Sequence, residues 1–368
     1  MGPGYWAWVI PLSTGNTSIG LVGHDSHIPF EVVRNLENTL AWMREHEPVL
    51  ARELEGLRVL DFCCLKNYSH NVARAWSSER WALVGEAGAF VDPLYSPGSD
   101  FIAFANSFTE EMIRCDLAGG DLTQRARELS ALYRSLVVNS IELYAHAAAV
   151  YGHPSALLAK VYWDNFTYWS YPCQLFMQGL YRLSGREMDA MIPIGMRYGQ
   201  LSNRMQLVLA AWAELAPEPT QKGFRGMPSY PSVLIDAHLA LRNRWDTKET
   251  LDAMRMRLVQ AEEIFGEILL RALDAVGPDR VDALIERLGA RSWDDLRIDD
   301  DRIEATGTVG LARRRALRPL ARDVERSLGQ PARQVDAATL GRARGPLVAR
   351  GIRPHDGEEV VLDPGGPS

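Results

Sequence analysis

The sequence predicts a mostly helical α+β protein, with a mixed strand–helix part over residues 1–120, a helical part over 121–350 and a tail over 351–368. Two β-prone runs separated by turn residues open the first part, which indicates a hairpin. Apolar residues recur at helical spacing through most of the second part. The 368 residues, 46% of them hydrophobic, suffice for two domains with a substantial core.

The first part is predicted to contain short strands and one long helix. In chain order these are strands over 5–12 and 17–22, a helix over 30–57 with a break at Pro48, and strands over 58–64 and 81–84. Ser13-Thr-Gly-Asn16 provides the residues of a tight turn between the first two strands. Pro48 interrupts the helix because proline has no N–H to donate.

A glycine-rich turn over 85–88 follows the last of these strands and leads to a helix that reaches about Leu117. Ser96 is a suitable N-cap for this helix, and Pro97 a suitable first residue, where the missing N–H costs nothing. Gly119-Gly120 is expected to end the helix and to mark the boundary between the two parts.

The second part is predicted to be a series of helices. Asp121 and Gln124 have the spacing of a capping box that opens a helix ending near Val150. Further helices are predicted over 155–182, 186–215, 232–242, 248–275, 278–288 and 311–327, with a proline- and glycine-rich loop over 217–231. The aromatic run Tyr162–Tyr171 either packs in the core, the commoner role, or lines a substrate cavity.

Composition argues against several classes of partner. The net charge of -7 disfavours nucleic-acid binding, which usually needs a basic surface. No apolar run reaches the roughly 18 residues of a membrane span, and no signal peptide is present, so a cytoplasmic protein is expected.

The cysteines and histidines do not predict a metal site. Cys63, Cys64, Cys115 and Cys173 have neither metal-ligand nor disulfide spacing, so buried reduced thiols are expected. His24-Asp-Ser-His27 lacks a third ligand nearby, and a solvated loop is the favoured interpretation.

The strand–turn–helix unit that begins at Trp81 has the features of a ligand site. Gly85 permits close approach of the backbone, and the Glu86 carboxylate can accept hydrogen bonds from sugar-type hydroxyls. After a kink at Pro93, the helix start offers free N–H groups to an electron-rich atom, which suits the N1–C2 carbonyl edge of a reduced flavin. The alternative is structural, since any such unit has a glycine turn and a capped helix.

Two motifs resemble those of a known family. The segment Gly85–Asp100 resembles the second flavin motif of FAD-dependent monooxygenases and halogenases, and Phe90-Val-Asp-Pro93 resembles the halogenase branch in particular. Trp6-Ala-Trp-Val-Ile-Pro11 matches the Trp-x-Trp-x-Ile-Pro signature of flavin-dependent halogenases. Leu12 and Thr17–Gly20 look like the members that act on carrier-bound substrates.

The resemblance, which covers about residues 1–117, implies a partial FAD-binding oxidoreductase fold and a set of site residues. The residues it places near the flavin are Gly85, Glu86, Asp92, Pro93, Ser96, Pro97, Gly98 and Ser99. Trp6, Trp8 and Tyr95 would lie on the substrate side, although hairpin packing is an equal alternative for either tryptophan. No catalytic residue and no metal ligand can be assigned.

Other features depart from the family pattern. Such proteins begin with a βαβ unit whose Gly-x-Gly-x-x-Gly turn holds the pyrophosphate. The only Gly-x-Gly here is Gly2-Pro-Gly4, so an N-terminal Rossmann unit is expected to be missing and the chain to be a C-terminal portion. Tyr95 stands where tryptophan halogenases have a glutamate. Pro97 has no N–H to offer a halide, so hydroxylation fits at least as well as halogenation.

Two functions remain open from the sequence. The first is an FAD-dependent oxidoreductase of the halogenase or monooxygenase type. It would act with reduced flavin and O2 on an electron-rich substrate, either a small molecule or one bound to a carrier, with a separate flavin reductase as a further partner. The alternative is a non-catalytic helical binding or scaffold protein derived from a flavoprotein.

Overall fold

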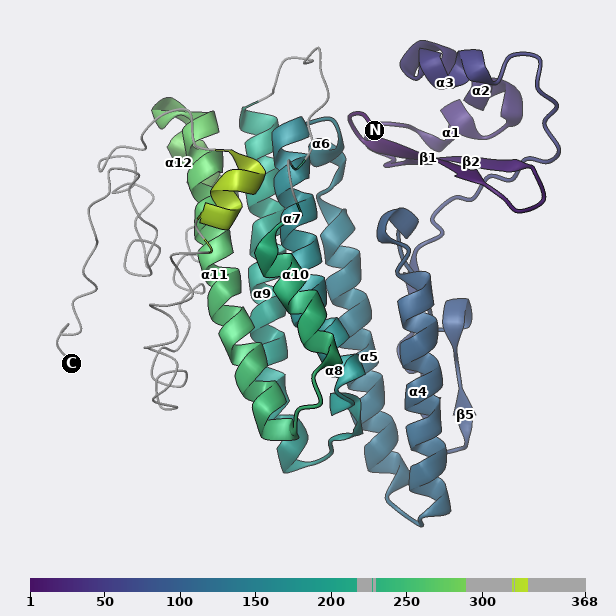
Figure 1. The fold of residues 1–368 in the computed structure, drawn as a ribbon. Coiled ribbons are helices and arrows are strands. Elements are labelled where there is room, and N and C mark those ends of the chain that lie inside the picture. The colour runs from purple at the N-terminus through teal and green to yellow at the C-terminus, as the bar shows by residue number, and fades with distance from the viewer. Residues whose placement is uncertain (217–226, 228–229, 289–319, 321, 330–368) are drawn as a thin grey trace.

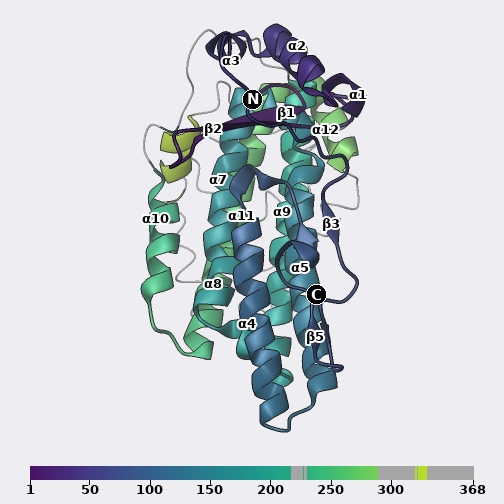
Figure 2. The ribbon, with the colours of Figure 1, turned by 90° about the vertical axis from the view of Figure 1, so that its right-hand side faces the viewer.

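The computed structural model describes residues 1–216, 227, 230–288, 320 and 322–329. These residues form a small N-terminal lobe beside one end of a bundle of long helices (Figures 1 and 2). Helices predominate and the sheets are small, which confirms the mostly helical α+β class. Most of the predicted loop over 217–231 and all of the tail lie outside the described residues.

The N-terminal lobe contains the predicted hairpin. Its elements are β1 (Tyr5–Pro11), β2 (Thr17–Gly23), α1 (Phe30–Val33), α2 (Leu36–His46) and α3 (Pro48–Glu53). The two strands are antiparallel, with Tyr5 opposite Gly23. The predicted helix over 30–57 is divided into three. Asn35 is extended and caps α2 by accepting a hydrogen bond from the Asn38 N–H, and the chain breaks again before Pro48, as predicted.

The predicted strand over 58–64 is wrong, because this segment is not part of any ladder in the described structure. The strand predicted over 81–84 is shorter, β5 (Trp81–Ala82), and pairs with β4 (Trp76–Ser77). A second small ladder joins β3 (His70–Asn71) to β6 (Ala89–Phe90). Every sheet of the described residues is therefore two-stranded and antiparallel. A strand needs a neighbouring strand, and no strand of the described residues pairs with 58–64.

From Gly98 onward the helices follow the predicted pattern closely. The last helix of the first part is α4 (Gly98–Leu117). The helical part contains α5 (Leu122–Ala145), α6 (Ala148–Tyr151), α7 (Pro154–Ser170), α8 (Pro172–Met177), α9 (Arg186–Leu215), α10 (Ser232–Leu239), α11 (Thr247–Val276) and α12 (Val281–Leu288). Asp121 caps α5, but the Gln124 side chain bonds to Glu128, so the reciprocal half of the capping box does not form. The helix predicted over 155–182 is divided at Tyr171, ahead of Pro172.

One hydrophobic core runs through the helices. It includes α4, α5, α7, α9 and α11, with α7 at its centre, where Tyr162, Trp163 and Phe166 are fully buried. Residues 320 and 322–328 are helical and extend one residue beyond the helix predicted over 311–327, the rest of which lies outside the described residues. The Asp323 carboxylate accepts hydrogen bonds from the first N–H groups of α10 and so substitutes for a local cap.

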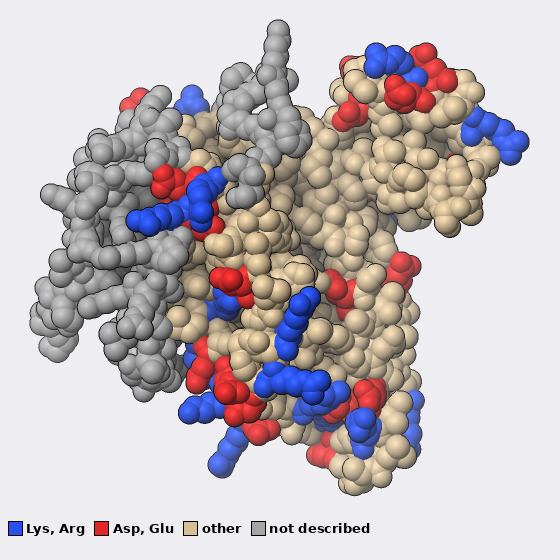
Figure 3. All heavy atoms as spheres, in the orientation of Figure 1, with Lys and Arg blue, Asp and Glu red and all other residues tan. Residues whose placement is uncertain are grey.

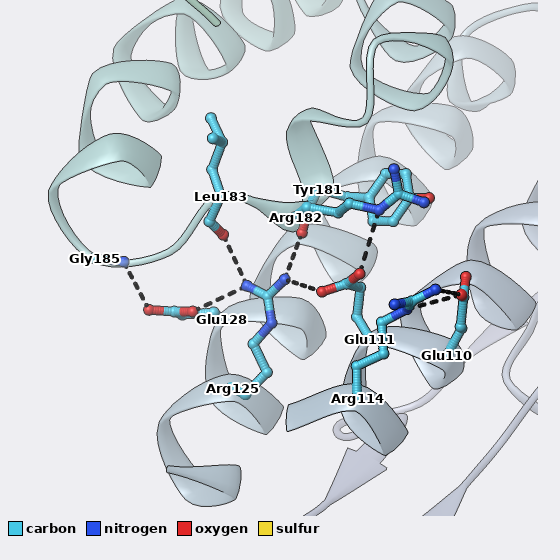
Figure 4. A network of polar contacts seen from close by, with 9 residues as sticks. All are labelled: Glu110, Glu111, Arg114, Arg125, Glu128, Tyr181, Arg182, Leu183 and Gly185. Atoms are coloured by element: carbon cyan, nitrogen blue, oxygen red, sulfur yellow. Dashed lines mark hydrogen bonds and ion pairs between the residues drawn. The ribbon is translucent and has the colours of Figure 1, made fainter. Parts of the chain in front are cut away.

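A buried arginine joins α5 to the turn before α9 (Figure 4). The Arg125 guanidinium donates to the carbonyl oxygens of Tyr181 (2.9 Å) and Leu183 (2.7 Å). It also pairs with Glu111 on α4 and Glu128 on α5. These contacts hold α4, α5 and the 181–185 turn together at the end of the bundle away from the N-terminal lobe (Figure 1).

Candidate functional site

The segment that resembles a flavin motif forms a series of turns before α4. Gly85 has φ +58°, a left-handed conformation that favours glycine, at the start of a single 3-10 turn. Asp92 begins a second 3-10 turn by accepting a hydrogen bond from the Leu94 N–H (2.9 Å). Ser96, also left-handed at φ +55°, ends that turn by donating its N–H to the Pro93 carbonyl.

The prediction that Ser96 caps α4 is therefore wrong. Because the Ser96 N–H closes the preceding turn, the residue ends one element and does not begin the next. The helix starts at Gly98, with Pro97 as its N-cap and no capping side chain. The start is exposed to solvent at Gly98 and Ser99, and a Cβ added at Gly98 would meet no protein atom within 4 Å. The N–H groups of this helix start are thus free to face a ligand.

A cavity of about 260 Å³ lies directly beside this helix start. Tyr95 and Pro97 of the motif line it, together with Asp100 in the first turn of α4. Its remaining walls come from α5, α7 and α9, including Ser140 and Asn139 of α5. Drug-sized ligands occupy pockets of roughly 300–1,000 Å³. The cavity thus has the size of a small substrate and is too small for a whole dinucleotide.

The aromatic run over 162–171 lies partly in the core and partly at the wall of the cavity. Tyr162, Trp163 and Phe166 pack in the core, whereas Tyr168 and Tyr171 line the cavity. The Tyr168 hydroxyl donates to a carboxylate oxygen of Asp100 (3.0 Å), across the cavity wall from α7 to α4. Burial raises the pKa of Asp100, and the hydrogen bond from Tyr168 opposes that shift.

A buried charged network supports the same wall. The Tyr95 hydroxyl donates to Asp164 Oδ2 (3.0 Å), and Lys160 Nζ lies 2.9 Å from that oxygen. Lys160 also donates to the Leu143 carbonyl (2.7 Å) and to Gln206 Oε1 (2.6 Å), while Gln206 Nε2 donates to Asp164 Oδ1 (2.9 Å). Each charge is therefore paired and hydrogen-bonded, as a buried charge requires.

Tyr95 is a neutral hydroxyl held in a fixed orientation by this network. Burial raises the pKa of Tyr95 well above its ordinary value, and the adjacent Asp164 charge raises it further. With its proton committed to Asp164, the Tyr95 oxygen can accept a hydrogen bond from a molecule in the cavity.

The two tryptophans of the hairpin motif do not line the cavity. Trp6 is 5% exposed and packs against Tyr151 of α6, and its indole N–H points to Asp92 Oδ2 (3.4 Å). Trp8 is half-buried and donates to Ser18 Oγ in the next strand (3.1 Å). The position of Trp6 therefore agrees with the alternative in which this tryptophan packs under the hairpin.

Asp92 connects the two sequence motifs. Its carboxylate accepts from the indole of Trp6 in β1, while the Tyr68 hydroxyl lies at 3.5 Å. Burial raises the pKa of Asp92, and its hydrogen bonds, the one from the Leu94 N–H first, lower it. The hairpin motif and the flavin-like motif are therefore adjacent in space, as their assignment to one site requires.

Glu86 lies at the exposed edge of the same region. Its carboxylate is in solvent, and its backbone carbonyl accepts a hydrogen bond from His70 Nε2 (2.8 Å), which fixes the turn after β5.

The sequence did not identify Asp100, Lys160 or Asp164 as site residues. Lys160 and Asp164 are four residues apart on one helix, and this spacing could have predicted an ion pair between them.

Metal and membrane signals are weak in the described residues. No group of three or more histidine, cysteine or acidic side chains there could hold a metal ion. The cysteine prediction was wrong for Cys63, which is exposed, and the other three are half-buried. No described helix has both the length and the apolar character to cross a membrane.

Comparison with known proteins identifies three similar sequences. A flavin-dependent halogenase of Dictyostelium discoideum is 27% identical over 173 residues, which are 46% of this chain and 29% of that protein. A 1H-pyrrole-2-carbonyl peptidyl-carrier-protein brominase of Pseudoalteromonas luteoviolacea is 24% identical over 119 residues, 32% of this chain and 29% of that protein. A flavin-dependent halogenase of Armillaria mellea is 30% identical over 103 residues, 25% of this chain and 19% of that protein.

The matched part is less than a third of the length of each of these relatives. No family model matches the chain, and no solved structure is significantly similar to it. All three relatives nevertheless belong to one enzyme type, the same type that the two motifs indicate. The chain is therefore similar, over part of its length, to flavin-dependent halogenases.

Proposed function

We propose that this chain forms the ring-facing side of an FAD site and the substrate cavity next to it, in an enzyme that oxidises or halogenates an electron-rich organic molecule. One observation in particular supports the proposal. Tyr95 and Pro97, which belong to the flavin-like motif, also line the 260 Å³ cavity. A molecule in the cavity would thus lie next to a flavin ring at the start of α4.

The residues at the helix start suit the ring edge of a flavin. Gly98 leaves open space, and the N–H groups of the first turn have no capping side chain to accept their hydrogen bonds. The positive end of the helix would stabilise charge at the carbonyl edge of the ring. Bound there, reduced flavin would supply the electrons that activate O2. Among the described residues there is no glycine-rich turn between a parallel strand and a helix to hold its phosphates.

The protein's own side chains would bind and orient the substrate. Tyr168 and Tyr171 offer aromatic walls, and the Tyr95 oxygen accepts a hydrogen bond from an N–H or O–H group. The half-buried Asp100 carboxylate can hold or accept a proton at the cavity wall, with its orientation fixed by Tyr168. Residues of α4, α5, α7 and α9 line the cavity and would limit the access of water to a bound substrate.

The form of the substrate is proposed from the brominase relative, whose name specifies a pyrrole group on a carrier protein. A carrier-bound arene could enter the cavity at its reactive end while the carrier remains outside. A flavin reductase would be a separate partner. Pro97 has no N–H to donate to a halide. The proposal therefore includes both oxygen transfer to the substrate and halogenation of the substrate.

The test is product formation by the protein purified from its source cells with any subunit that accompanies it. FAD, a flavin reductase with NADH as its electron donor, O2 and bromide are supplied with pyrrole-2-carboxylate, free or carrier-bound, and mass spectrometry detects brominated or hydroxylated pyrrole. Ser140→Phe should abolish the product because the ring fills the cavity that Ser140 lines. Ser135→Phe, on the exposed side of the same helix, should retain it. If the unaltered protein binds FAD but forms no product, the enzymatic function is rejected and the non-catalytic binding function is retained.

A further inference from the structure

The candidate cavity has acidic side chains in its wall and no basic one. Asp100 and Asp164 line it, and none of the described residues around it is a lysine, an arginine or a histidine. The charge of Asp164 is balanced by Lys160, whose Nζ lies 2.9 Å from the Asp164 Oδ2. The Asp100 carboxylate forms no ion pair within the described residues, and it accepts a hydrogen bond from Tyr168 (3.0 Å). Asp100 therefore provides the unbalanced charge of the cavity.

The surroundings of Asp100 do not supply the missing cation. Asp100 lies in the first turn of α4, where the partial positive charge of the helix start favours an acidic side chain. The side of the N-terminal lobe toward the helices shows no lysine or arginine in the view of Figure 3. Burial raises the pKa of Asp100. A ligand that brings a positive or hydrogen-donating group would stabilise the charged form of this carboxylate, and a ligand carboxylate would destabilise it.

Several hydroxyl groups of the wall have already donated their protons to the protein. Those of Tyr168 and Tyr95 donate to the two carboxylates. The Thr167 hydroxyl donates to a backbone carbonyl of its own helix, α7. A hydroxyl has one proton and two lone pairs, so each of these groups can still accept a hydrogen bond from a ligand but has no proton left to donate. The cavity therefore favours a ligand that brings its own N–H or O–H group.

We propose that Asp100 determines the specificity of this cavity, by accepting a hydrogen bond from an N–H or O–H group on the substrate ring and by excluding substrates that carry a free carboxylate. The inference rests on the proposed function of the cavity, and it does not depend on where the flavin binds. A pyrrole joined to a carrier through its carbonyl group keeps the ring N–H and has no carboxylate charge. Free pyrrole-2-carboxylate is an anion. Asp100 therefore selects the joined form.

The test is a ligand-observed NMR titration of the protein purified as for the activity assay, without an electron donor, so that binding is measured without turnover. Methyl pyrrole-2-carboxylate has the ring N–H and no charge, pyrrole-2-carboxylate has the N–H and a negative charge, and methyl 1-methylpyrrole-2-carboxylate has neither. We expect the first to bind at least about tenfold more tightly than either of the others. Two carboxylates a few ångströms apart repel each other, and an N-methyl group leaves the Asp100 acceptor without a donor.

Matched variants identify the residue responsible. Asp100→Asn keeps an oxygen for the Tyr168 hydroxyl and removes the charge, so free pyrrole-2-carboxylate should then bind within about threefold of the methyl ester. Glu110→Gln removes a negative charge from an exposed position of the same helix and should leave the preference unchanged. Ser140→Phe fills the cavity and should abolish binding of the ester, which places the ligand there.

The proposal would be overturned if the unaltered protein bound the methyl ester no more tightly than the free acid, or did not bind it. Binding of the ester by the Ser140→Phe variant, or an unchanged preference in the Asp100→Asn variant, would overturn it as well. Failure of the proposed function gives a different result. If the expected ranking is found but no brominated or hydroxylated pyrrole forms in the activity assay, the specificity of Asp100 is retained and the enzymatic function is rejected.

Discussion

Replacing Gly98 by valine is expected to weaken flavin binding at least about tenfold without unfolding the protein, a loss of about 1.4 kcal/mol. The added side chain would occupy the space where the ring edge approaches the first turn of α4. Because a Cβ at Gly98 meets no protein atom within 4 Å, the substitution crowds a ligand and not the fold. Quenching of flavin fluorescence on titration measures the affinity.

Ala118→Val, at the opposite and exposed end of α4, is the control for this experiment. It places the same side chain at a terminus of the same helix, far from the site, and should leave the affinity unchanged. Equal affinities of the Gly98→Val variant and the unaltered protein would show that the flavin does not lie at this helix start.

Replacing Lys160 by methionine should lower the free energy of unfolding by about 3–5 kcal/mol, because it leaves the Asp164 charge buried without its cation. The Lys160 side chain is fully buried, and Asp164 is 3% exposed. Methionine nearly matches the length of the lysine stem, so lost packing contributes little. The midpoint of urea unfolding, with an unchanged slope, measures the effect.

Two further variants identify the cause. Lys160→Met combined with Asp164→Asn removes both charges and should recover most of the lost stability, since no unpaired charge remains. Arg114→Met breaks an exposed pair with Glu110 and should change stability by less than about 1 kcal/mol. If the double variant were as unstable as Lys160→Met, the loss would come from packing and not from the buried charge.

The helices could be predicted from local sequence, because their signals lie within a few residues. The prediction over 186–215 coincides with α9, and Asp121 caps α5 as expected. Residues 58–64 could not be predicted in this way, since a strand depends on a neighbour distant in the chain. Ser96 was misassigned because two elements compete for one turn, and only the fold shows that its N–H bonds to Pro93.

Part of the candidate site consists of residues that the sequence had named. Tyr95 and Pro97 line the cavity, and Gly98 lies at the open start of α4; their contact with a flavin stays a prediction. The opposite wall depends on how α5, α7 and α9 pack, which no local pattern specifies. Burial of Lys160 and Asp164 is likewise a tertiary property, because the same spacing on an exposed helix would be a surface ion pair.

The most direct test of the central claim compares FAD with lumiflavin, the ring system without phosphates, as ligands of residues 1–368. A ring of about 20 non-hydrogen atoms at about 0.3 kcal/mol each gives a Kd on the order of 0.1 mM. Since these residues are proposed to contact only the ring, the two Kd values should agree within about threefold. FAD binding about a hundredfold tighter than lumiflavin would reveal a phosphate site in these residues. If neither FAD nor lumiflavin binds, the result contradicts a ring site at the start of α4.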